Sequence, residues 1–105
     1  MGFESKTKHQ LERHIRTVAK DSSKVIFTFH SAHESMVRRG VSRAEVMECL
    51  QKGMIDLEPE RDIIGGLKCR MERYIAGRNV AVVVALDDDD PHLILVTVIT
   101  KKKRK

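Results

Sequence analysis

The segment from residue 25 to residue 53, VIFTFHSAHESMVRRGVSRAEVMECLQKG, constrains the fold most strongly, because it places the signals of two helices directly after a strand-forming run. Ser31 and Glu34 form a capping box, in which the hydroxyl accepts a free amide of the first helical turn and the carboxylate accepts the cap amide. Gly40 suits the left-handed position that ends a helix. We therefore expect a first short helix at about 32–39.

The second helix carries the same signals. Ser42 and Glu45 form another capping box, and Gly53 follows the last residue of the helical pattern. The sequence therefore predicts a second short helix at 43–52, directly after the first. The run VIFTF before both helices is β-branched and aromatic, which is typical of a strand.

The second half of the chain has the pattern of a sheet. Residues 67–76, LKCRMERYIA, alternate between apolar and polar side chains, which predicts a strand with one buried face and one polar face. The polar face would carry Lys68, Arg70, Glu72 and Tyr74. A turn at Gly77-Arg78 leads into NVAVVVAL, whose unbroken apolar character predicts a strand covered on both faces. After a turn at 87–91, HLILVTVIT completes an antiparallel meander of three strands.

The chain of 105 residues is long enough for one domain with one modest core. Its helices come first and its strands follow, which is typical of an α+β fold rather than of an alternating α/β fold. Residues 3–20 form an amphipathic pattern with a narrow apolar stripe, which predicts a helix packed on the sheet. We expect a single domain over 1–105, with a helical appendage at 1–20, a core at 24–100 and a basic tail at 101–105.

The formal net charge of +5 comes from the last five residues, KKKRK, since the rest of the chain balances 15 basic against 15 acidic side chains. Such a tail binds phosphate backbones through counterion release in some proteins and serves only solubility in others. The sequence leaves both interpretations open. The charge therefore does not by itself indicate a nucleic-acid partner.

Several function classes are disfavoured. No apolar run approaches the roughly 20 residues needed to cross a bilayer, and residues 1–20 lack the apolar centre of a signal peptide. Cys49 and Cys69 lack the repeated close spacing of a zinc site, so we expect reduced core thiols in a cytoplasmic protein. The four aspartates at 87–90 lack the spacing and glycine of a calcium loop. We predict no metal, no cofactor and no membrane partner.

Short motifs between residues 25 and 100 follow one another in a definite order: Thr28 in the first strand, His30, Met36 in a helix, Arg39-Gly40, Ser42, and Thr97 in the last strand. In this order and spacing the chain resembles a family of small bacterial proteins of unknown function. That family is in turn similar to the RelE-like and MqsR-like toxins of toxin-antitoxin systems, which have a ribonuclease fold of the BECR type.

The resemblance implies helices set against a curved antiparallel sheet, and a metal-independent ribonuclease or a catalytically silent relative. In that family the histidine stands five positions before the methionine, whereas His30 stands six positions before Met36. Ser31 occupies the family position. Either the helix start is shifted by one residue or the family histidine is absent.

Metal-independent RNA cleavage moves the 2′-hydroxyl onto the adjacent phosphorus, which requires groups that transfer protons and cations around the phosphate. The hypothesis assigns proton transfer to His30 or His33, because histidine titrates near neutral pH. Arg70 is the central cation, and Tyr74 on the same strand face would stack on a base or supply a proton. The proposed phosphate-binding and RNA-binding set is Arg39, Lys68, Arg70, Thr97 and Lys101.

Each candidate also has a structural explanation. His30 and His33 flank a helix start, where histidine often serves as a surface or local hydrogen-bonding group. Arg39 lies at a helix C-terminus, where a cation interacts well with the helix dipole. Lys68 and Arg70 would then be the solvated face of a strand.

Two function classes remain. The first is a toxin-like RNA-directed domain, with RNA, including ribosome-associated mRNA, and a cognate antitoxin as partners. The alternative is a non-catalytic binding module on the same scaffold, with a protein or nucleic-acid partner. An aromatic content of 4% disfavours sequence-specific reading of single-stranded RNA on a stacking platform.

Overall fold

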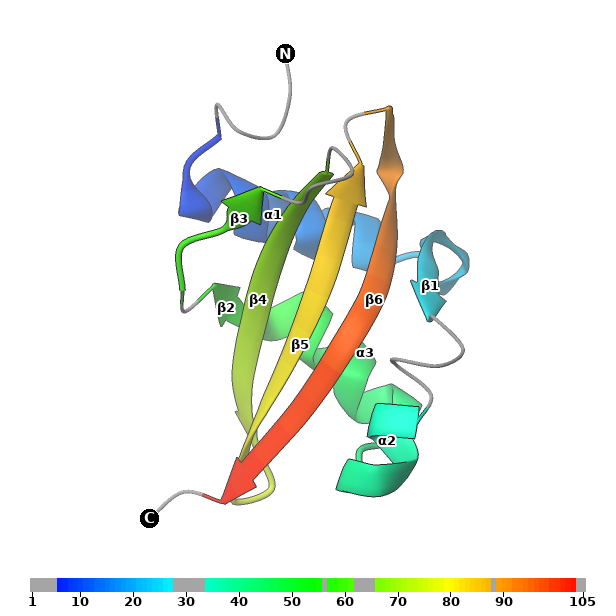
Figure 1. Ribbon diagram of the computed structural model, residues 1–105, viewed down its shortest axis with the longest axis vertical. Coiled ribbons are helices and arrows are strands. Elements are labelled where there is room, and N and C mark those ends of the chain that lie inside the picture. Colours follow the sequence, from blue (N-terminus) through cyan, green and yellow to red (C-terminus); the bar gives the residue numbers. More distant parts are fainter. Residues whose placement is uncertain (1–5, 28–33, 56, 62–65, 88, 104–105) are drawn as a thin grey trace.

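The protein has an α+β fold in which helices cover one face of a six-stranded sheet (Figure 1). A computed structural model describes residues 6–27, 34–55, 57–61, 66–87 and 89–103, and the side chains of all these residues except Ser35, Pro91 and 97–103. The elements in chain order are α1 (Lys8–Ala19), a 3₁₀ turn (Ser22–Lys24), β1 (Val25–Phe27), α2 (Glu34–Arg39), α3 (Arg43–Lys52), β2 (Met54–Ile55), β3 (Glu60–Arg61), β4 (Gly66–Ile75), β5 (Arg78–Asp87) and β6 (Asp90–Lys103).

The strand order across the sheet is β1-β6-β5-β4-β2, and β3 also pairs with β4. The predicted meander of β4, β5 and β6 is confirmed, with antiparallel pairing throughout. β1 pairs with β6 in parallel, so the sheet is mixed rather than purely antiparallel. The intervening helices α2 and α3 carry the chain from one edge of the sheet to the other, which allows this parallel pairing.

The second predicted helix has the predicted bounds and cap. The Ser42 hydroxyl accepts from the amide of Glu45 at 3.1 Å, and the Glu45 carboxylate accepts from the amide of Ser42 at 2.9 Å. Gly40 has a φ of +64°, as expected for a left-handed helix stop. The first capping box includes Ser31, which lies outside the described residues, and the described part of that helix is Glu34–Arg39.

The turn between β4 and β5 lies one residue earlier than the sequence predicts. Ile75 pairs with Arg78, so the two loop residues are Ala76 and Gly77 rather than Gly77 and Arg78. Both have positive φ angles, +50° for Ala76 and +81° for Gly77. Two consecutive positive φ angles match the twist of the flanking strands, and this requirement outweighs the poor fit of alanine.

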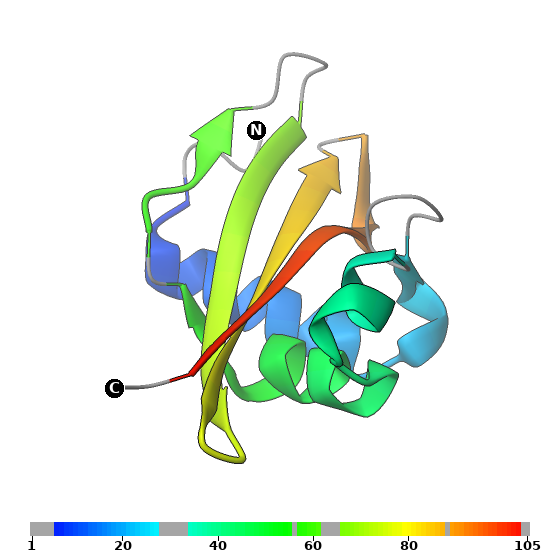
Figure 2. The same ribbon diagram turned by 60° about the horizontal axis from the view of Figure 1, so that its bottom comes forward.

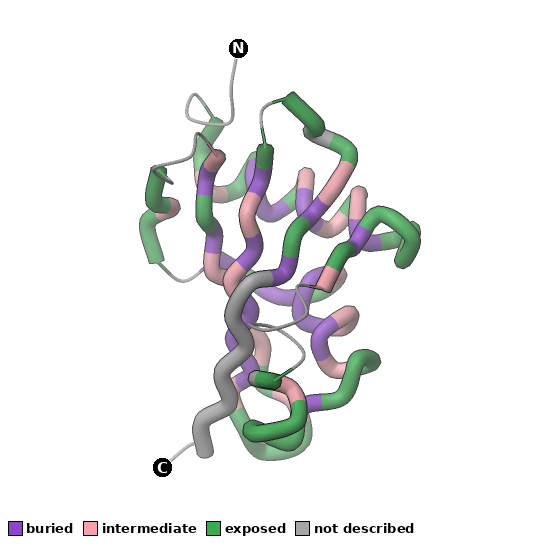
Figure 3. Tube along the Cα trace, turned by 45° about the vertical axis from the view of Figure 1, so that its right-hand side comes forward, coloured by how far each residue is buried: buried purple, intermediate pink, exposed green. Residues whose placement is uncertain are grey.

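Only one face of β5 is fully covered, although its apolar run predicts cover on both faces. Val80, Val82, Val84 and Leu86 are fully buried toward the helices. On the opposite face Val83 and Ala85 are only partly buried, although Ala81 is buried, and α1 and α3 lie on the other side of the sheet (Figure 1). Buried positions accordingly alternate with more exposed ones along the strands (Figure 3). We call this uncovered side of the sheet the open face.

The N-terminal helix α1 packs on the sheet, as its apolar stripe predicts, and its buried side belongs to the core. Leu11, Ile15 and Ala19 are almost completely buried and join the same hydrophobic cluster as the strands and α3. Arg16 donates from Nε (3.2 Å) and Nη2 (2.7 Å) to the carbonyl of Gly53. The helix lies behind the sheet beside α3, on the side away from the open face (Figures 1 and 2).

Glu12 connects α1 to the edge strand β2 through a hydrogen bond. Its side chain is buried and accepts a 2.7 Å hydrogen bond from the amide of Ile55. Replacing Glu12 with alanine should destabilise the protein by about 1–3 kcal/mol in urea unfolding, because a buried amide would lose its acceptor. Glu12→Gln, which keeps an acceptor oxygen, should recover most of this loss. Equal destabilisation by both variants would contradict the role of the hydrogen bond.

Both cysteines are buried free thiols, as the sequence predicts. The Cys49 thiol donates to the carbonyl of Met71 at 3.2 Å. Burial raises the pKa of Cys69 to about 12, so this thiol stays protonated at neutral pH. No helix among the described residues is long and apolar enough to span a membrane.

Candidate functional site

Side chains on the open face fall into transverse rows set by the strand register. One row runs from Ile26 on β1 through Leu95 on β6, Ala85 on β5 and Lys68 on β4 to Glu60 on β3. The next row contains Arg70 and Val83 and continues to the backbone position of Val98. Small or branched apolar residues occupy the middle strand, whereas long charged residues stand along β4.

The edge of the sheet beside Arg70 is interrupted. β2 pairs with Met71 and Glu72, and β3 pairs with Leu67 and Lys68. Between these paired segments, Cys69 and Arg70 of β4 have no partner residue in β2 or β3. The two edge strands are only two residues long each, and short edge strands limit further strand pairing.

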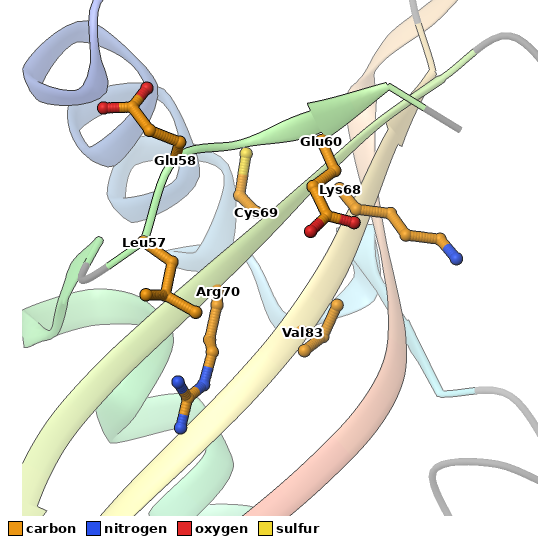
Figure 4. A pocket seen from close by; sticks show the side chains of 7 residues that line it. All are labelled: Leu57, Glu58, Glu60, Lys68, Cys69, Arg70 and Val83. Atoms are coloured by element: carbon orange, nitrogen blue, oxygen red, sulfur yellow. The ribbon is translucent and has the colours of Figure 1, made fainter.

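A pocket of about 170 Å³ lies at this interruption of the sheet edge (Figure 4). The lining residues are Leu57, Glu58, Glu60, Lys68, Cys69, Arg70 and Val83. Leu57 lies beside the stem of Arg70, and the carboxylate of Glu58 is turned toward α1, where it accepts from Lys8 Nζ at 3.0 Å. Glu60 pairs across the strands with Lys68. The pocket therefore combines an apolar wall with both signs of charge.

Arg70 is the cation nearest the middle of the open face. About a third of its side chain is exposed, and Nη2 lies 4.0 Å from Oε2 of Glu72, the next residue on the same strand face. This arrangement leaves the guanidinium partly accessible and places a carboxylate beside it. A guanidinium can bind a phosphate through two parallel hydrogen bonds, and a nearby carboxylate can accept a proton.

Tyr74 lies on the same strand face as Arg70, toward the hairpin end of β4. The two residues are four positions apart on β4, or about 13 Å at the usual rise of a strand. The Tyr74 hydroxyl lies at the hairpin turn, because a Cβ added to Gly77 would stand 3.9 Å from it. About half of Tyr74 is exposed, so its ring is available at the end of the face and not at the pocket.

The other described candidates lie farther away. Arg39 is exposed at the end of α2, which packs against β6, two strands from β4. The position of Lys101 pairs with Val80, which belongs to the helix-covered face, whereas Lys102 pairs with Asn79, the partner of Tyr74. By backbone register, the position of Lys102, and not that of Lys101, stands in the same row as Tyr74.

Thr97 occupies an irregular position in β6. Val96 pairs with Val84 and Val98 pairs with Val83, so Thr97 has no partner residue in β5 and forms a bulge. The next residue, Val98, stands in the row of Arg70, because Val83 pairs with both. Such a shift interrupts the regular pairing of the two strands, which no period-2 reading of the sequence anticipates.

His30 and His33 lie outside the described residues. The described chain stops at Phe27, which pairs with Val96 beside the Thr97 bulge, and resumes at Glu34. The described parts of the chain hold no group of three or more histidine, cysteine, aspartate or glutamate side chains arranged to bind a metal ion. Of the predicted site residues, Lys68 and Arg70 are those that line one pocket.

Residues 27–100 match a family described as Domain of unknown function (DUF4258). The chain belongs to this family. The match includes β2 to β5, most of β6 and both short helices, and it begins after α1, although α1 contributes to the same core. No curated protein and no solved structure was found to match the chain.

Sequence reasoning missed two features of this site. Glu72 was placed on the open face by its alternation with Arg70, but no role was assigned to it. The contribution of Leu57 was not anticipated, because it depends on how the chain between β2 and β3 passes the edge of β4. The proline and paired glycines of the segment EPERDIIGG are typical of a loop and give no indication of a pocket.

Proposed function

We propose that the protein is a toxin-like RNA-directed domain whose open face binds the RNA backbone next to Arg70. The supporting observation is that Arg70 and Lys68 line one pocket, beside the small apolar residues of the middle strand. In this role the guanidinium stabilises the negative charge that develops on phosphorus during metal-independent cleavage. Lys68 stands two positions before Arg70 on the same strand face and adds a second positive charge.

Proton transfer has two candidate sources. His30 and His33 belong to the segment that follows Phe27, and Phe27 pairs with Val96, two residues before Val98 in the row of Arg70. Glu72 lies 4.0 Å from Arg70 and is a base already on the open face. Tyr74, at the end of the face, is better placed to stack on an RNA base than to act at the phosphorus.

The relation to RelE-like and MqsR-like toxins forms part of this proposal. A layer of helices on one face of an antiparallel meander is consistent with that fold. A toxin of this kind implies an antitoxin partner, and an RNA-directed role would place the protein in the cytoplasm, in agreement with its reduced thiols.

The deciding test compares Arg70→Ala with the wild type in controlled bacterial expression and in an RNA cleavage assay without metal. We expect growth arrest from the wild type, and about a 100-fold loss of cleavage rate in Arg70→Ala, as when one charge-stabilising donor is removed from an active site. Arg78→Ala, which removes an exposed cation at the hairpin end of β5, should keep the wild-type rate. Equal cleavage by all three proteins would contradict the assignment of Arg70.

A non-catalytic binding module is the second candidate, and one observation favours it. Ile26 and Leu95 are neighbours in one row of the open face and are 43% and 38% exposed. Met54 and Leu57, near the opposite edge, are still more exposed. Exposed apolar side chains on one face commonly mark a protein-binding surface. Absence of both growth arrest and cleavage with wild-type protein would favour this module over the ribonuclease.

A further inference from the structure

The outer side of α1 forms a second candidate surface, separate from the open face. A shallow, open groove of about 300 Å³ runs along it, lined by Lys6, Gln10, Arg13, His14 and Thr17. These positions recur every three or four residues, so they share one side of the helix. Leu11, Ile15 and Ala19 occupy the opposite side and are buried in the core.

The charged side chains that line the groove are positive. Two of the five lining residues, Lys6 and Arg13, are cations, in a chain whose first hundred residues are neutral overall. Glu12, the only acidic residue of α1, is buried on the other side against Ile55. No carboxylate lines the groove among the described residues. The outer side of α1 therefore presents a positive surface.

Helix stability does not explain the cations in the groove. Arg16 has a structural role through its two hydrogen bonds to Gly53, and Lys8 is paired with Glu58. Lys6 and Arg13 instead face the groove, and Arg13 Nη2 lies 3.2 Å from Nε2 of His9. The first turn of the helix contains no acidic residue, although acidic side chains would suit it best.

The lining residues have the chemistry of phosphate contacts. Lysine, arginine and glutamine side chains are usual donors to phosphate oxygens in nucleic-acid complexes, and the groove contains one of each. No aromatic side chain lines the groove, so it offers no surface for base stacking. A membrane-surface helix needs an exposed apolar side, and none of the described exposed large apolar residues lies on α1.

We infer that the outer side of α1 binds the phosphodiester backbone of a nucleic acid without reading its base sequence. This site goes beyond the proposed function of the open face. It lies on the opposite layer of the molecule and on a helix that precedes the family match. Phosphate contacts at this site would supply affinity that depends on salt but not on base sequence. Any preference for a cleavage position would depend on other residues.

The test measures binding of full-length protein to a short mixed-sequence single-stranded RNA and to duplex DNA, by fluorescence anisotropy over about 50 to 200 mM salt. For Lys6→Gln/Arg13→Gln we expect weaker binding, with a slope of log K against log salt that is shallower by about 1.4 for the single strand and about 1.8 for the duplex. The matched control is Lys24→Gln/Lys52→Gln, which removes the same charge from exposed positions outside the groove.

The control double variant should retain most of the wild-type slope. An unchanged slope in Lys6→Gln/Arg13→Gln, or an equal loss in both double variants, would overturn the inference. So would groove-dependent binding to phosphatidylserine vesicles without binding to either nucleic acid. Arg70→Ala separates the two surfaces: its cleavage defect tests the open face, and the salt slope of the α1 variant tests the groove independently of any cleavage.

Discussion

Replacing Gly53 with alanine is expected to destabilise the protein by about 3 kcal/mol, the cost of forcing extra volume into a closely packed site. The backbone of Gly53 is extended, with φ of −77°, so a left-handed conformation is not the reason. The reason is space. A Cβ would collide with the carbonyl oxygen of Cys49 and stand 2.9 Å from that of Glu72, and both atoms belong to the backbone.

Gly53 has little room to move away from this collision. Its amide donates to the carbonyl of Cys49 at 2.8 Å, and its own carbonyl accepts both hydrogen bonds from Arg16. Relief of the clash would therefore disturb the end of α3, the start of β2 and the attachment of α1 together. The measurement is urea unfolding followed by circular dichroism at constant protein concentration.

Gly40→Ala provides the control for Gly53. Gly40 has a φ of +64° and nothing within 4 Å of an added Cβ, so alanine there should cost only about 1 kcal/mol of left-handed strain. Equal destabilisation at the two positions would show that the close approach of Cys49 and Glu72 does not limit residue 53. A loss of folding in Gly53→Ala alone would agree with the prediction.

Replacing Ile15 with alanine should destabilise the protein by about 2–5 kcal/mol, even though residue 15 precedes the part of the chain that matches the family. Ile15 is completely buried and belongs to the same cluster as the strands and α3. Its truncation removes apolar contacts and leaves a cavity between α1 and the sheet. Urea unfolding should remain a single cooperative transition at a lower midpoint.

Thr17→Ala is the matched control on the same helix. Thr17 is exposed, and its hydroxyl donates to the carbonyl of Arg13, a bond whose loss is offset by the better helix propensity of alanine. Its effect should stay within about 0.5 kcal/mol. If Ile15→Ala also stayed within that range, α1 would be an appendage and not part of the core.

The candidate site was partly accessible from the sequence. Strict alternation in β4 was enough to place Lys68, Arg70 and Tyr74 on one face, because side chains alternate with a period of two. It could not show that the Tyr74 hydroxyl lies at the hairpin turn. Nor could it show that the backbone position of Lys101 pairs with Val80, which belongs to the helix-covered face. Those facts depend on the turn geometry and on the Thr97 bulge, which are set by pairing between strands.

The sequence by itself determined the local elements: the cap of α3, the glycine stop at Gly40 and the meander of three strands. These depend on interactions within a few residues, so short patterns specify them. Tertiary structure decided the parallel pairing of β1, the burial of α1, and the pocket that joins Leu57 to Arg70. These depend on contacts between distant segments, whose energies come from shared burial and not from any local pattern.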